Sequence, residues 1–103
     1  MIKYAVKVSD YVDDDVDAIY KYILKKSFSI HSAEKWIRKI YDRIESLSTW
    51  PERYARFRFD DQARITHVGR YSIIYDVYND IHEVLVLRVV YSRRNVAKLE
   101  LSR

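Results

Sequence analysis

The hydrophobic period of this chain changes halfway along its length. From residue 12 to residue 47 apolar side chains recur every three or four positions, which is the spacing of amphipathic helices. From residue 65 to residue 91 the apolar residues instead form β-branched and aromatic runs that turn residues separate. A helical first half followed by a strand-rich second half restricts the fold to the α+β class.

Two helices are expected in the first half. The first runs from about residue 11 to residue 26, with Ser9 or Asp10 as its cap and with carboxylates in its first two turns, where they favour the positive helix N-terminus. The second begins after Ser29 or Ser32 and ends before Trp50, because a residue that precedes proline is pushed out of the helical region. The short link between them predicts an antiparallel hairpin.

Strands are expected on either side of the helices. Residues 2–8 alternate as a strand with one buried face, formed by Ile2, Tyr4, Val6 and Val8. In the second half, segments 65–68, 71–78 and 83–91 form an antiparallel meander, and Gly69, the single glycine, is expected in a tight turn with positive φ.

Residues 84–90 are apolar on both faces, which is typical of a central strand or of one that a partner covers. The predicted architecture is a single domain over residues 1–103, with an N-terminal strand and an antiparallel helical hairpin packed on a small, mainly antiparallel sheet. Its length is that of one domain.

Several classes of site are excluded by what the sequence lacks. A single glycine leaves no glycine-rich phosphate loop, and the absence of cysteine excludes disulfides and thiolate sites. His31, His67 and His82 lie singly, without zinc-ligand spacing, and no serine lies in a nucleophile elbow. We therefore expect no cofactor and no metal. No apolar run reaches the length of a membrane span and residues 1–8 do not resemble a signal peptide, so we expect a cytoplasmic protein that does not enter a membrane.

The positive charge lies in the second half of the chain. Residues 51–103 carry ten basic and seven acidic residues, a net charge of +3 out of +4 for the whole chain, and nine of those ten are arginine. Arginine offers a planar fork of donors that suits phosphate and carboxylate groups. One interpretation is a surface that meets nucleic acid or an acidic protein segment; the other is that arginine stems simply cover the sheet.

The candidate site residues are Arg64, Arg88, Tyr91, Arg93 and Arg94. Arg64 begins the first meander strand and the others end the last, so the antiparallel topology predicts that they converge on a surface that lacks carboxylates. Such a surface could hold a polyanion and stabilise charge that develops on a phosphorus-bound oxygen. The alternative is that Arg88 only extends from the sheet and that Arg93 and Arg94 are solvated.

Four segments resemble the RelE/ParE toxin superfamily in order and spacing: 17–23, 47–51, 63–77 and 87–95. The resemblance implies the toxin of a type II toxin–antitoxin system, a class that includes plasmid stabilization systems. It also implies a short cognate antitoxin with a partly disordered acidic segment, which would cover the doubly apolar strand and pair with the arginines.

The superfamily contains two mechanisms. RelE-like members are endoribonucleases that cut messenger RNA on the ribosome, and that branch would make Arg64 and Tyr91 catalytic here. ParE-like members inhibit DNA gyrase by binding it, with Arg64, Arg88, Arg93 and Arg94 as binding residues here. The Tyr-Ser-Arg-Arg-Asn segment at 91–95 looks ParE-like, no histidine lies near Tyr91, and lysine is absent from residues 51–97. We therefore expect gyrase inhibition, with RNA cleavage as the alternative, so whether the chain is an enzyme stays open; an adaptor domain without toxicity is the third possibility.

Overall fold

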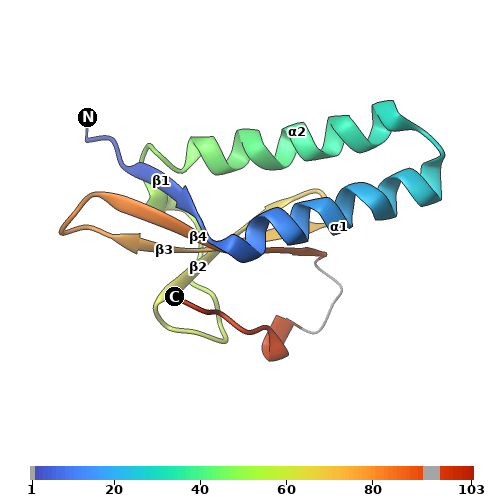
Figure 1. The fold of residues 1–103 in the computed structure, drawn as a ribbon. Coiled ribbons are helices and arrows are strands. Elements are labelled where there is room, and N and C mark those ends of the chain that lie inside the picture. Colours follow the sequence, from blue (N-terminus) through green and yellow to red (C-terminus); the bar gives the residue numbers. More distant parts are fainter. Residues whose placement is uncertain (1, 92–95) are drawn as a thin grey trace.

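Two helices form a hairpin that lies over one face of a sheet. The structure is a computed structural model, and it describes residues 2–91 and 96–103. Helix α1 spans Asp10–Ser27 and helix α2 spans Ile30–Ser46, and the two run antiparallel above the strands (Figure 1). The predicted hairpin is confirmed, with both helices close to their expected bounds.

The sheet has four strands in the order β1-β4-β3-β2. Strands β2 (Ala63–Val68), β3 (Tyr71–Tyr78) and β4 (Glu83–Tyr91) form the expected antiparallel meander. Strand β1 (Ala5–Val8), the first of the chain, lies at the outer edge of β4 and pairs with it in parallel. Two short 3-10 turns, η1 (Pro51–Arg53) and η2 (Val96–Lys98), complete the described elements.

Both faces of the sheet are covered by the chain itself. The helical hairpin covers one face, on which Ile73, Tyr75 and Val86 are fully buried. Residues 96–101 lie beneath the other face, where Ile74 and Leu87 are buried with Phe57 (Figure 1). The doubly apolar pattern of β4 therefore reflects a central strand with two cores, and no partner is needed to explain it.

The predicted inward face of β1 is only partly right. Val6 and Tyr4 are half-buried, but Ile2 and Val8 are 61% and 41% exposed. The physical reason is that the strand begins at Ala5, so Ile2 lies before it, and that β1 is an edge strand, which pairs on one side with residues 83–86 alone.

Gly69 makes the turn between β2 and β3 with φ of +56°, as predicted. A Cβ atom at this position would lie 2.5 Å from the Trp36 indole on α2, so the glycine also lets the hairpin turn approach the helix. Neither helix of the described chain combines the length and the apolarity that a bilayer span requires.

Candidate functional site

A β-bulge at Leu87 directs Arg88 toward α1. In the β3–β4 register Tyr75 lies opposite Val86 but Ile74 lies opposite Arg88, so Leu87 is the extra residue. Pairing with β1 ends at Val86. Within the described part of the chain, the remaining outer edge of β4 has no strand neighbour.

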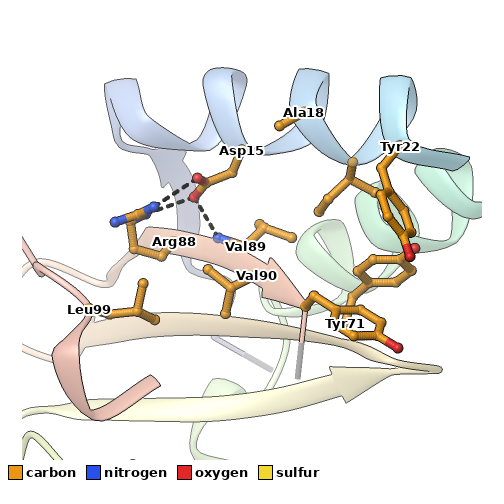
Figure 2. Close-up of a pocket in the computed structure, with 10 residues that line it drawn as sticks. Asp15, Ala18, Tyr22, Tyr71, Arg88, Val89, Val90 and Leu99 are labelled. Atoms are coloured by element: carbon orange, nitrogen blue, oxygen red, sulfur yellow. Dashed lines mark hydrogen bonds and ion pairs between the residues drawn. The ribbon is translucent and has the colours of Figure 1, made fainter. Parts of the chain in front are cut away.

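The carboxylate of Asp15 on α1 occupies this edge. It accepts a hydrogen bond from the backbone N–H of Val89 at 3.0 Å and two from the guanidinium of Arg88, at 2.8 Å and 2.9 Å (Figure 2). Both side chains are mostly buried, with 18% of Arg88 and 13% of Asp15 exposed. The hydrogen bonds to Asp15 raise the pKa of Arg88 above its ordinary value, and the pair neutralises the positive charge.

A cavity of about 260 Å³ lies beside this ion pair, between α1 and β4. Asp15 and Arg88 line one end of it, and Tyr22 and Tyr71 lie at the other (Figure 2). Tyr91 also lines the cavity, with its ring 5.9 Å from that of Tyr71 in an edge-to-face arrangement. This cavity suits an apolar or aromatic side chain of a partner, because the charges of Asp15 and Arg88 at its end already neutralise each other.

Arg64 lies in a different environment. It sits opposite Tyr75 in the register, and its Nη1 donates to the carbonyls of Tyr54 at 2.8 Å and of Glu52 at 3.2 Å. The Glu52 carboxylate lies 3.5 Å away. Arg64 and Arg88 therefore have separate partners, and each has a carboxylate.

The predicted single surface without carboxylates is thus wrong for Arg64 and Arg88. The bulge turns Arg88 to α1, whereas Arg64 lies beneath residues 52–54. Arg93 and Arg94 lie outside the described residues, so their predicted binding role stays a prediction. The cavity holds Tyr91 together with Arg88, as the sequence predicted, but not Arg64.

A different group of arginines gathers around Tyr54. The guanidinium carbon of Arg53 lies 4.6 Å from the Tyr54 ring centre, and that of Arg43, from the last turn of α2, lies 5.3 Å from it. Arg64 donates to the carbonyl of the same residue. Three arginines from three segments of the chain therefore meet at one tyrosine.

Arg56 adjoins this group at the edge of the sheet. It forms an isolated antiparallel bridge with Arg64, and directly opposed residues share a face of a sheet. Because Arg64 is in turn opposite Tyr75, which packs beneath the helices, Arg56 and Arg64 lie on the helix-covered face. We call these four residues the arginine cluster: Arg43, Arg53, Arg56 and Arg64.

Neutral oxygen atoms hold most of the cluster. Arg43 donates to Thr66 Oγ1 at 2.6 Å and to the carbonyl of His67 at 2.9 Å. Arg53 donates to the carbonyls of Thr49 and Trp50 just beyond α2, and Arg56 donates to the carbonyl of Asp61 at 3.1 Å. Among the described ion pairs, Glu52–Arg64 is the only one that the cluster makes.

The acidity of Tyr54 reflects this uncompensated charge. Burial alone would raise the pKa of its phenol, but the hydrogen bond with Arg53 and the charges of Arg43 and Arg53 outweigh burial and lower the pKa. The surroundings of Tyr54 therefore favour negative charge, which is the electrostatic property of an anion site.

Only part of the cluster could be expected from the sequence. Arg43 follows Ile40 by three positions on the buried stripe of α2, which indicates a position beside the sheet. Arg53 directly precedes Tyr54 in an arginine-rich connection. No sequence signal, however, shows that α2 ends above β2, and this placement brings the two residues together.

The histidines form no site with one another. His31, His67 and His82 are all exposed, and His67 Nδ1 lies 2.9 Å from Ser72 Oγ. Over residues 2–91 and 96–103, no three histidine or acidic side chains are grouped so as to hold a metal ion.

Comparison with known proteins agrees with this fold. The profile of the family described as ParE toxin of type II toxin–antitoxin system, parDE, matches residues 6–96. The fold is similar to that in the chromosomal ParDE toxin–antitoxin system from P. aeruginosa, with a TM-score of 0.76 and 18% identity over 88% of this chain and 98% of that chain. No curated protein sequence matches the chain.

Two RelE structures are also similar. A mutant of E. coli toxin RelE in the free state gives a TM-score of 0.70 with 10% identity, over 96% of this chain and 94% of that chain. The toxin–antitoxin complex RelBE2 from Mycobacterium tuberculosis gives a TM-score of 0.62 with 19% identity, over 88% and 93%. At these identities the structural likeness establishes the fold.

Proposed function

The chain belongs to the ParE toxin family of type II toxin–antitoxin systems, and from this premise we propose that it stops bacterial growth by binding and inhibiting DNA gyrase in the cytoplasm. The proposal makes it an inhibitor that acts through its surface and not an enzyme. The alternative is ribosome-dependent cleavage of messenger RNA, as in RelE-like toxins.

The closed ion pair between Arg88 and Asp15 is the observation that carries this choice. RNA cleavage needs cations that are free to stabilise a phosphorane and a group that can take the proton of a 2′-hydroxyl. The charge of Arg88 is taken up by Asp15, and Tyr91 lies in an apolar cavity against Tyr71. Arg64, the other proposed catalytic residue, lies on β2, which β3 separates from β4, and it donates hydrogen bonds to backbone carbonyls there. The described residues therefore do not bring the proposed nuclease groups to one place.

We propose that the cognate antitoxin covers the cavity between α1 and β4. Antitoxins are present in the similar ParDE and RelBE2 structures. An apolar side chain of an extended antitoxin segment suits the space between Tyr22, Tyr71 and Tyr91. That acidic residues of the same segment pair with Arg93 and Arg94 stays a prediction from the sequence.

Controlled expression without antitoxin tests the target. Plasmid supercoiling and the 5′ ends of messenger RNA are read from the same culture, with and without a co-expressed antitoxin from the neighbouring reading frame. We expect relaxed plasmid and a DNA-damage response while transcripts stay intact. New 5′ ends at codon positions with normal supercoiling would replace gyrase inhibition with RNA cleavage, and normal growth with soluble protein would remove the toxin assignment.

A further inference from the structure

The arginine cluster keeps most of its positive charge, whereas two other arginines of the described residues are neutralised by carboxylates. Arg88 is paired with Asp15, and Arg103 is paired with both Asp60 and Asp76. Arg43 and Arg53, by contrast, are held by hydroxyl and carbonyl oxygens, which fix a guanidinium without cancelling its charge. A ligand that binds there loses little side-chain freedom in the arginines, because they are already ordered.

The layout of the cluster favours a ligand with repeated charges. Its members come from the end of α2, from η1, from the bridge at residue 56 and from β2, so the positive charge extends to the edge of the sheet. Arginine forks match phosphate oxygens in geometry, and a chain of net charge +4 is attracted to a polyanion over long range.

The cluster does not offer a stacking platform for unpaired bases. The ring of Tyr54 is already in contact with the guanidinium groups of Arg43 and Arg53. Single-stranded nucleic acids are held largely by bases stacked on free aromatic faces, whereas duplex DNA can be held by its backbone alone. Trp50, which is 71% exposed three residues before Arg53, is the aromatic side chain by which the two cases can be separated.

We propose that the arginine cluster binds the phosphate backbone of duplex DNA. The inference rests on the proposed function and deepens it: the toxin would contact gyrase and the DNA that gyrase holds at the same time. Arg64 takes part as a cluster member, and its Glu52 partner is 43% exposed, so a phosphate can compete for the guanidinium.

Fluorescence anisotropy of a labelled DNA duplex tests the inference with the purified chain alone. The variant R53Q/R56Q removes two charges from the cluster, and R38Q/R70Q removes two exposed charges from the outer side of α2 and from the β2–β3 turn. The two variants have equal net charge, so they separate a local site from general attraction. R56Q alone, at an exposed side chain with one backbone contact, serves if R53Q/R56Q does not fold.

We expect R53Q/R56Q to bind the duplex at least about 10-fold more weakly than the wild type, and to reduce the slope of log K against log salt by about 1.8, as two lost phosphate contacts would. R38Q/R70Q should change the affinity less than about 2-fold. Equal losses in both variants, or no binding by the wild type at low salt, would overturn the proposal.

Two further arms identify the ligand. Tighter binding of single-stranded RNA than of duplex, lost on Trp50→Ala, would overturn the duplex assignment and favour the RNA alternative. Displacement of the duplex by polyglutamate at equal charge concentration would assign the cluster to an acidic peptide instead. A gyrase supercoiling assay on the same proteins distinguishes the two proposals. Cluster-dependent DNA binding without gyrase inhibition contradicts the proposed function only. Gyrase inhibition that survives in R53Q/R56Q contradicts the DNA contact only.

Discussion

Asp15 bridges two neighbours on β4: its carboxylate holds the guanidinium of Arg88 and the backbone N–H of Val89 at the same time. One side chain of α1 thus accepts the hydrogen bond of a backbone N–H on β4 that lies beyond the pairing with β1, and it also neutralises the arginine beside that N–H. The position of α1 on the sheet and the state of Arg88 therefore depend on the same group.

Replacing Arg88 tests whether this pair is structural. Arg88→Gln should lower the free energy of unfolding by about 2 kcal/mol, because it leaves the mostly buried Asp15 carboxylate with too few donors. Urea unfolding followed by circular dichroism measures the change. Lys21→Gln, which breaks an exposed pair with Asp17, is the control and should leave the midpoint of unfolding nearly unchanged, because solvent screens that pair. If Arg88→Gln is as stable as the wild type but loses binding to antitoxin or gyrase, Arg88 is a binding residue, as the sequence suggested.

Replacing Tyr91 separates its ring from its hydroxyl. Tyr91→Phe should keep full growth inhibition, because the ring packs on Tyr71 and the proposed function uses no phenolic proton. Tyr91→Ala should destabilise the fold by about 2 kcal/mol through the lost packing. Growth curves after induction, normalised to soluble protein, report the result. Loss of toxicity in a folded Tyr91→Phe protein would support a catalytic hydroxyl and RNA cleavage.

Acid should weaken the contact between Arg103 and Asp60. The hydrogen bonds from Arg103 hold the pKa of Asp60 below its ordinary value of 3.8. A lowered folded-state pKa contributes stability that is complete above the unfolded pKa and is lost as the pH falls through about 4 and below. We expect Tm to fall in this range and Arg103→Gln to flatten that fall. An unchanged acid profile in Arg103→Gln would show that other carboxylates dominate.

Gly69→Ala should destabilise the chain by about 2 kcal/mol, because it combines a strained positive φ with a clash against the Trp36 indole. In a Trp36→Leu background the clash is relieved, so the same substitution should cost about 1 kcal/mol. A double-mutant cycle by urea unfolding gives both values. Equal costs in the two backgrounds would mean that the indole moves aside.

Alkaline pH should destabilise the chain through Tyr75. Its buried hydroxyl donates to the Pro51 carbonyl at 2.6 Å, and burial raises the pKa of Tyr75 to about 12. A raised folded-state pKa for an acid contributes stability that is present below about pH 10 and is lost as the pH rises toward 12. Tyr75→Phe should cost about 1 kcal/mol at neutral pH and reduce the alkaline loss. Unfolding curves between pH 8 and about 11.5 measure both effects, and an equal alkaline loss in both proteins would refute this role.

The elements could be predicted because their signals are local. The period of apolar residues in α1 and α2, the single glycine at the β2–β3 turn and the two apolar faces of β4 each follow from neighbouring residues. The grouping of arginines could not, because it depends on two features that have no local signal. One is the bulge at Leu87, which sends Arg88 to α1; the other is the end of α2 above β2, which brings Arg43 to Tyr54.

The segment beneath the sheet also affects how the chain emerges from the ribosome. Ile74 and Leu87 precede in the chain the residues 96–101 that cover them. Arg103, which pairs with the fully buried Asp76, is synthesised later still. The nascent chain therefore exposes one apolar face of the sheet until these residues leave the exit tunnel. During that interval chaperones and proteases can bind the exposed face.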